Sequence, residues 1–196
     1  MRIEHTALQD CLHIQPDVHV DERGTFVKTF HRDQFAAHGL ATGFAESFHS
    51  VSRRGVLRGL HFQLPPHDHV KLVHCTAGRA FDVAVDLRVG SPTEGRWAAF
   101  ELSAEQNNML YIPAGFAHGW YALTEGAQLT YQVTTIHAPQ HDSGIHWDSA
   151  GIRWPDMSPL VSVRDARLLQ LCDFHSPFVY KASVDGIPGE VRCVSF

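Results

Sequence analysis

The sequence predicts an all-β domain, arranged as a sandwich or a barrel. Several segments alternate apolar and polar side chains with a period of two, which is typical of strands with one buried face. Turn-forming stretches rich in Gly and Pro separate these segments, and little of the chain has the character of a helix. These observations together favour many short antiparallel strands around one core.

The clearest alternation lies at residues 81–87, where apolar side chains at odd positions alternate with Asp82, Ala84 and Asp86. Strands are also predicted at residues 25–30, 70–75, 97–102 and 129–134. Helices are expected at residues 31–38 and at residues 165–171, the second of which contains no β-branched residue.

One segment does not fit a regular strand. Arg58 and His61 are three positions apart, so a strict period of two places them on opposite faces. A bulge or kink at Gly59 is expected to let both side chains reach one pocket. Without such an irregularity, only one of them belongs to the site.

Length and composition predict one ordinary globular domain. The chain has 196 residues, and we expect a domain over residues 1–174 with a tail, residues 175–196, that packs on the domain or at a dimer interface. The net charge of −5, without a basic patch, argues against nucleic-acid binding. The four cysteines are widely spaced and form no CxxC pair, which argues against a zinc ribbon or a disulfide framework.

No membrane or export signal is expected. The N-terminus lacks the apolar segment of a signal peptide, and no apolar run reaches the about 18 residues that a membrane span needs. The sequence therefore predicts a cytoplasmic protein that binds no membrane.

Two β-like runs, residues 55–63 and 113–120, each carry a histidine near glycine. His61 and His118 in these runs, with Lys71 and Tyr131, suit the movement of a proton on and off carbon. Histidine has a pKa near working pH, which suits a general base. A lysine can stabilise a developing enolate oxygen, and a tyrosine can return a proton from the other face. An enzyme is therefore favoured over a passive module.

The ordered set of motifs resembles the dTDP-4-dehydrorhamnose 3,5-epimerase (RmlC-type) family of nucleotide-sugar epimerases, in the cupin superfamily. The matching stretches are residues 21–26, 55–63, 71–73, 81–88, 91–93, 112–119, 144–147 and 162–165. The resemblance implies a cupin-like jelly-roll β-barrel with a few short flanking helices, and a homodimer. It also implies an isomerase that inverts carbons flanking the C4 ketone of a nucleotide-diphosphate 4-keto-6-deoxy sugar. This chemistry uses no metal and no redox cofactor.

The resemblance also implies roles for individual residues. By position, His61 is similar to the family's general base, and Asp165 to the carboxylate that orients it. Lys71 resembles the residue that steadies the enolate oxygen. Tyr131 resembles the acid that delivers a proton from the opposite face.

Substrate-binding residues are implied in the same way. Arg58 and His118 resemble residues that line the sugar and diphosphate site, whereas Arg23 and Phe26 resemble residues that contact the nucleotide. Asp142 stands where the family usually has Glu, and we expect it to bind substrate.

Three departures from the family pattern concern the nucleotide base. Lys28, Glu46 and Phe48 stand where the family usually has Glu, Gln and Asn, at positions that help to read thymine. The carboxylate of Glu46 can accept two hydrogen bonds from guanine N1 and N2, whereas thymine offers one donor. We therefore hypothesise a GDP-linked substrate, with a dTDP-, CDP- or UDP-linked sugar left open.

Other readings remain open. Smaller departures leave a C3-only epimerase possible, as is a keto-isomerase on the same substrate class. A metal-dependent cupin enzyme is suggested by His67-x-His69, but the glutamate expected after that motif is missing. A non-catalytic sugar-binding jelly roll needs the pocket but not the acid–base residues.

Overall fold

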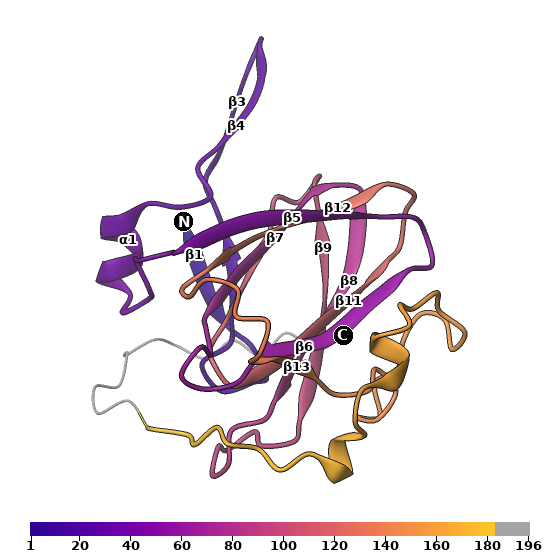
Figure 1. The fold of residues 1–196 in the computed structure, drawn as a ribbon. Coiled ribbons are helices and arrows are strands. Elements are labelled where there is room, and N and C mark those ends of the chain that lie inside the picture. Colours follow the sequence, from indigo (N-terminus) through magenta and orange to yellow (C-terminus); the bar gives the residue numbers. More distant parts are fainter. Residues whose placement is uncertain (183–196) are drawn as a thin grey trace.

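The computed structural model describes residues 1–182, so residues 183–196 of the predicted tail lie outside the described part. Two antiparallel sheets face each other in a jelly-roll barrel, which confirms the all-β prediction (Figure 1). The six-stranded sheet has the order β1 (Arg2–His5), β2 (Leu12–Gln15), β10 (Met109–Ile112), β7 (Lys71–Ala77), β12 (Ala127–Val133) and β5 (Glu46–Ser52). The five-stranded sheet has the order β13 (Asp142–Gly144), β6 (Leu57–Gln63), β11 (Phe116–Ala122), β8 (Arg79–Asp86) and β9 (Trp97–Ser103).

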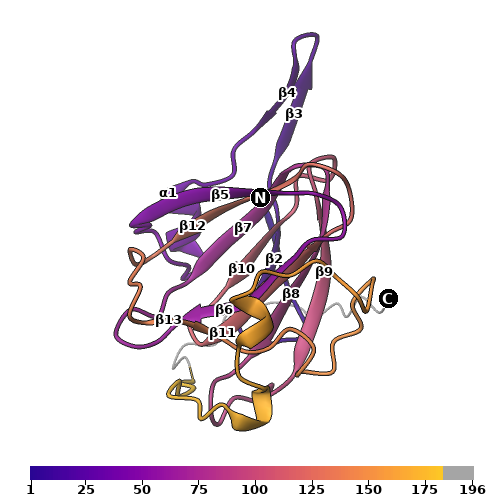
Figure 2. The ribbon, with the colours of Figure 1, turned by 45° about the vertical axis from the view of Figure 1, so that its right-hand side comes forward.

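A hairpin of β3 (Val18–Asp21) and β4 (Gly24–Val27) stands apart from both sheets. It projects away from the barrel in the views of Figures 1 and 2. Its apolar side chains are open to solvent, with Val20 75% exposed and Phe26 61% exposed.

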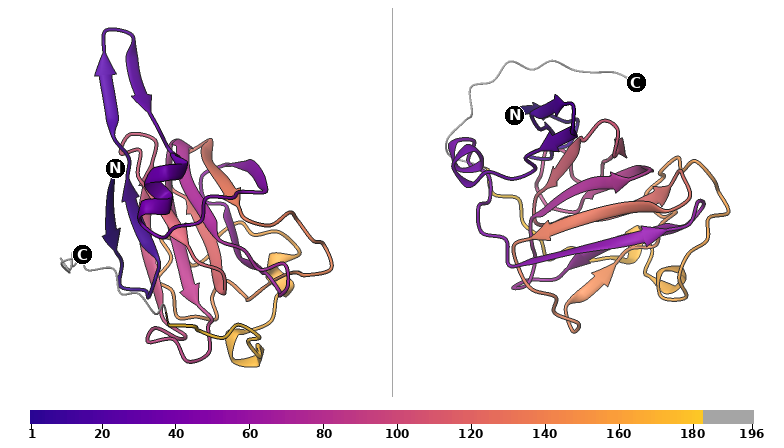
Figure 3. Two further views of the ribbon diagram at one scale, coloured as in Figure 1. Left: turned by 90° about the vertical axis from the view of Figure 1, so that its left-hand side faces the viewer. Right: turned by 90° about the horizontal axis from the view of Figure 1, so that it is seen from above.

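Four of the predicted strands are confirmed as β7, β8, β9 and β12, with ends that differ from the predicted ones by at most two residues. The strand predicted at residues 25–30 is shorter, because β4 ends at Val27. The first predicted helix is present as α1 (Arg32–Ala37), which lies against the outer face of the six-stranded sheet (Figure 3). Phe35 anchors it, because its ring is fully buried and packs edge-on against Phe30. No helix within residues 1–182 is long and apolar enough to cross a membrane.

The helix predicted at residues 165–171 is wrong. A 3-10 turn, η1 (Asp165–Arg167), forms beside β6 (Figure 2), and Leu168 is already extended at φ −64° and ψ 154°. A second 3-10 turn, η2 (Leu171–Asp173), begins only at the last predicted residue. The Asp165 carboxylate points into the barrel and accepts hydrogen bonds from β6, which fixes η1 by tertiary contacts. Local helix propensity is overridden by that contact.

The core consists of layers on both faces of the five-stranded sheet. Its inner face packs against the six-stranded sheet through large side chains such as Leu102, Trp120 and Leu129. Its outer face is covered by the C-terminal segment, where Trp154 and Phe178 are buried. The described part of the tail therefore packs on the domain.

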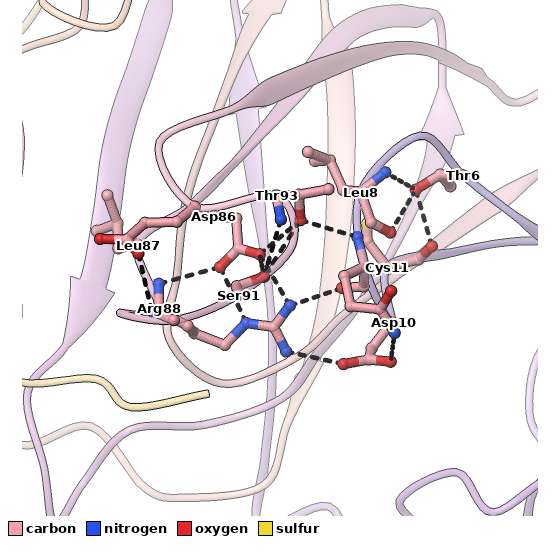
Figure 4. Close-up of polar contacts among 12 residues, drawn as sticks. Thr6, Leu8, Asp10, Cys11, Asp86, Leu87, Arg88, Ser91 and Thr93 are labelled. Atoms are coloured by element: carbon pink, nitrogen blue, oxygen red, sulfur yellow. Dashed lines mark hydrogen bonds and ion pairs between the residues drawn. The ribbon is translucent and has the colours of Figure 1, made fainter. Parts of the chain in front are cut away.

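A buried ionic network joins the loop after β8 to the loop before β2 (Figure 4). Arg88 donates to both carboxylate oxygens of Asp86 at 2.9 Å, and Ser91 and Thr93 donate to the same carboxylate. Arg88 also reaches Asp10 in the loop before β2. These charges are paired and do not line the pocket described below, so Asp86 belongs to the scaffold.

The expected irregularity in β6 is present. His118 pairs with His61 and Trp120 pairs with Arg58, so three steps along β6 match two steps along β11. The extra residue in β6 is the mark of a β-bulge, and it turns Arg58 and His61 to the same side. The two strands approach closely there, since a Cβ built on Gly119 lies 2.8 Å from the carbonyl oxygen of Arg58.

Gly119→Ala should therefore destabilise the fold. The added methyl group meets backbone atoms that cannot yield, so we expect a loss of about 2 kcal/mol in the free energy of unfolding. Denaturant unfolding followed by circular dichroism measures this loss. Gly43→Ala is the control, because a Cβ at Gly43 has no neighbour within 4 Å. Equal stability of the two variants would contradict the close approach of β6 and β11.

Candidate active site

One pocket of about 670 Å³ opens between the two sheets. It brings together nine of the twelve predicted site residues: Glu46, Phe48, Arg58, His61, Lys71, His118, Tyr131, Asp142 and Asp165. They come from β5, β6, β7, β11, β12, β13 and η1, so both sheets and the C-terminal segment contribute.

His61 is held by Asp165. Its Nε2 lies 2.7 Å from Asp165 Oδ1, and the backbone N–H of Gly59 donates to Oδ2 at 3.2 Å. Burial alone raises the pKa of Asp165, but the hydrogen bonds and charge of His61, with the donors of Gly59 and Ser162, lower it below its ordinary value. Asp165 thus stays ionised and orients the imidazole. With Nε2 bound to Asp165, Nδ1 is the ring nitrogen of His61 that is suited to accept a proton.

Lys71 places a buried ammonium group in the same pocket. Its Nζ donates to the carbonyl oxygen of His61 at 3.0 Å, which fixes its position beside the base. Burial lowers its pKa to about 8, while the charges of Asp142 and Asp82 oppose this shift. At neutral pH Lys71 is therefore mostly protonated and is suited to stabilise a negative oxygen.

A second histidine–carboxylate pair lies deeper. His118 Nε2 is 3.0 and 2.9 Å from the two oxygens of Asp82, and both side chains are almost completely buried. Burial lowers the pKa of His118 despite the opposing effect of Asp82. A neutral His118 held in this way presents a fixed hydrogen-bonding edge to the pocket.

Tyr131 is fixed by aromatic neighbours. Phe48 stacks on it with ring centroids 4.8 Å apart and an interplanar angle of 13°. His118 meets the same ring edge-on at 5.8 Å. Burial raises the pKa of the phenol far above its ordinary value, with Asp82 adding to the shift, so Tyr131 is a neutral proton donor at physiological pH.

The pocket mouth carries several charges. Glu46 Oε2 accepts a hydrogen bond from the backbone N–H of His137 at 2.6 Å. Asp142 pairs with Arg164, whose Nη2 lies 2.9 Å from Asp142 Oδ1. Arg58 is tied to β5 through Ser52 and the carbonyl oxygen of Val51, which aims its guanidinium along the pocket wall. These groups are suited to hold the charged, polar part of a ligand.

Three predicted binding residues do not line this pocket. Arg23 and Phe26 lie on the projecting hairpin, and Lys28 follows it; all three are exposed. The hairpin extends away from the barrel, so the structure does not bring these residues together with His61 in one chain. Their role in binding stays a prediction.

Sequence reasoning missed several lining residues, among them Ser50, Gln63, His69, Trp120, His137, Ser162 and Arg164. Arg164 directly precedes Asp165 within a motif that was noted, so its place in the site was accessible from sequence. Ser50 also could be found, because it shares a strand face with Glu46 and Phe48. The sequence around Trp120 indicates only a buried aromatic residue, so its place in the pocket wall could not be predicted.

The second histidine of the His67-x-His69 motif has other contacts. His69 Nδ1 lies 3.1 Å from Thr135 Oγ1 and 3.2 Å from Gln63 Nε2. Burial lowers its pKa to about 3, and the charge of Lys71 acts in the same direction. Within residues 1–182, no three His, Cys, Asp or Glu side chains gather in a way that could hold a metal ion.

Comparison with known proteins gives a consistent assignment. Residues 5–173 match the family model described as dTDP-4-dehydrorhamnose 3,5-epimerase. The chain is 43% identical over 168 residues to the dTDP-4-dehydrorhamnose 3,5-epimerase of Shigella flexneri, covering 84% of this chain and 93% of that protein. It is 38% identical over 176 residues to the dTDP-4-dehydrorhamnose 3-epimerase of Streptomyces niveus, covering 88% of this chain and 85% of that protein.

The fold leads to the same family. The dTDP-6-deoxy-D-glucose-3,5-epimerase RmlC of Legionella pneumophila, solved in complex with dTDP-4-keto-L-rhamnose, superposes with a TM-score of 0.87. The two are 36% identical, and the match covers 92% of this chain and 99% of that one. The facing sheets, the pocket between them and these similarities show that the chain belongs to the dTDP-4-dehydrorhamnose 3,5-epimerase family of isomerases.

Proposed function

We propose that this enzyme inverts C3, C5 or both in a nucleotide-diphosphate-linked 4-keto-6-deoxy sugar, by removing a proton and returning it from the other face. The observation that carries the proposal is the position of His61 and Tyr131 on facing sheets of one pocket, with Lys71 beside them. A base and an acid on opposite walls are what inversion at carbon requires. No cofactor enters the scheme.

In the first step, Nδ1 of His61 takes the proton from a carbon next to the ketone. The electron pair moves to the C4 oxygen and forms an enolate, which the Lys71 ammonium stabilises. Asp165 stabilises the imidazolium that results, since its carboxylate lies 2.7 Å from Nε2.

In the second step, Tyr131 gives its proton to the same carbon from the opposite face. The C–H bond forms, the ketone is restored and Tyr131 is left as a phenolate. A second round at the other flanking carbon gives a 3,5-epimerase. One round alone gives a C3-only epimerase, and the Streptomyces niveus relative bears that name. Proton return at another atom of the enolate would instead give a keto-isomerase.

The substrate's nucleotide is the least constrained part of the proposal. The relatives compared above are named for dTDP sugars, which supports dTDP. Glu46 supports GDP instead, because its carboxylate lines the pocket and can accept two donors from guanine. One of its oxygens already accepts the His137 N–H, but each carboxylate oxygen can accept more than one hydrogen bond.

A homodimer accounts for the projecting hairpin. Arg23 and Phe26 are exposed on an arm and do not line the pocket between the two sheets. We infer that the arm of one copy reaches the pocket of the other, where Arg23 adds positive charge for the diphosphate and Phe26 stacks on the base. Sedimentation as a monomer at all concentrations would contradict this arrangement.

We place the reaction in the cytoplasm, in the synthesis of surface polysaccharides or glycosylated metabolites. Recovery of the protein with another cell fraction would contradict this location.

Substitution of the base and of the acid should have different effects. In heavy water, His61→Asn should abolish both deuterium uptake at carbon and inversion, because no group removes the proton. Tyr131→Phe should slow inversion by about a hundredfold or more but retain deuterium uptake from the His61 side. Proton NMR of the recovered sugar measures both quantities. Full inversion by either variant would contradict the assigned roles.

Lys71 should limit the rate at high pH. Burial lowers its pKa to about 8, so kcat/KM of the enzyme should fall as the pH rises through that value, because the neutral amine no longer stabilises the enolate. Lys71→Arg keeps the positive charge, so its profile should lose this fall, at a lower maximal rate. A wild-type profile that stays flat between about pH 7 and pH 10 would remove Lys71 from this role.

Binding of free nucleotides tests the base preference. If Glu46 reads guanine, GDP should bind more tightly than dTDP in isothermal titration, and Glu46→Gln should reduce that difference. Glu105→Gln is the control, because it changes an exposed carboxylate outside the pocket. A preference of wild type for dTDP by about tenfold or more would exclude the GDP assignment.

A further inference from the structure

Two hydrogen-bonding atoms in the pocket wall are buried and unpartnered. They are Nε1 of Trp120 and Oγ of Ser50, and neither finds a hydrogen-bond partner among residues 1–182. The Trp120 side chain is 1% exposed, yet the residue lines the pocket. A buried indole N–H without an acceptor lowers the stability of the fold. Its presence in a polar pocket therefore suggests that it serves the reaction.

Both atoms belong to the surroundings of the Tyr131 hydroxyl. Trp120 on β11 and Tyr131 on β12 come from facing sheets and pack in the same inner core cluster. Ser50 on β5 pairs with Leu129, two residues from Tyr131, so it lies diagonally opposite Tyr131 on the same face. Burial raises the pKa of Tyr131, and the Ser50 hydroxyl and the Trp120 N–H act to lower it, although neither atom completes a hydrogen bond in the free pocket.

The phenolate of Tyr131 is the species that most needs these donors. Once Tyr131 has given up its proton, a negative oxygen is left in a buried site, and the nearby Asp82 carboxylate disfavours it further. Arg58 supplies an opposing charge, but it is tied to β5 by Ser52 and Val51. An indole N–H can only donate, so it stabilises a phenolate more than a neutral phenol.

We propose that the Trp120 N–H and the Ser50 hydroxyl hold the Tyr131 oxygen and stabilise its phenolate while the proton is delivered to carbon. The Tyr131 O–H bond breaks as the new C–H bond forms, the enolate returns to the ketone, and the phenolate later regains a proton from water. Trp120 and Ser50 are thus positioning residues, since they act through Tyr131 and not on the sugar. This deepens the proposed function and rests on it.

Trp120→Phe tests the proposal, because it removes the N–H and keeps an aromatic ring. The probe is 4-keto-6-deoxyglucose linked to dTDP or to GDP, whichever form wild-type enzyme turns over faster, in heavy water. Inversion and deuterium uptake with retention are measured separately by NMR. The His61 side chain is 29% exposed, so its proton can exchange with solvent and report on the first step alone. We expect kcat for inversion to fall about tenfold or more, with uptake through His61 and KM nearly unchanged.

Two further variants make the result decisive. Trp97→Phe is the matched control, since Trp97 packs in the other core cluster and does not line the pocket. Ser50→Ala should also lower the ratio of inversion to deuterium uptake. This variant tests the proposal if Trp120→Phe does not fold. An equal fall of both rates, a change in KM alone or an unchanged ratio would each overturn the proposal. Wild-type enzyme that takes up no deuterium with the dTDP-, GDP- or CDP-linked form of the sugar would instead overturn the proposed function itself.

Discussion

The close approach of β6 and β11 is the constraint on which the site depends. Glycines at positions 59 and 119 leave room for one backbone to pass the other, and the extra residue in β6 changes which side chains face inward. As a result, Arg58 and His61 project into the pocket beside His118, although a regular strand would separate them. A side chain at either glycine would disturb the wall that carries the base.

The two histidine–carboxylate pairs show how burial assigns different tasks to the same chemistry. His61 remains partly exposed in the pocket, and its ionised partner Asp165 comes from the C-terminal segment. His118 and Asp82 are sealed in the core, where burial favours the neutral ring. The first pair therefore suits proton transfer, and the second suits fixed positioning.

Sequence reasoning predicted the parts of the fold that are governed by local pattern. The long strands β7, β8, β9 and β12 alternate clearly, and helix α1 follows from its local sequence. The segment at Asp165 could not be predicted in this way, because its geometry depends on a contact with His61 more than a hundred positions away. Very short strands such as β13 have too few residues to show a period.

The site likewise contains residues that a local motif identifies and residues whose position depends on distant contacts. Most predicted residues meet in one pocket because motifs on paired strands come together when the sheets close. Arg23 and Phe26 do not, since the hairpin that carries them forms a separate sheet and projects away from the barrel. The place of Trp120 beside Tyr131 depends on how the two sheets face each other, which no motif reports.

The most direct test of the account is the position of deuterium in the sugar after wild-type enzyme acts on 4-keto-6-deoxy sugars in heavy water, with dTDP-, GDP- and CDP-linked forms compared. Proton transfer by His61 and Tyr131 predicts one deuterium at each carbon that is inverted, C3, C5 or both, with no exchange elsewhere. An inverted product that carries no solvent deuterium, or no exchange with any of these sugars, would contradict proton transfer by His61 and Tyr131.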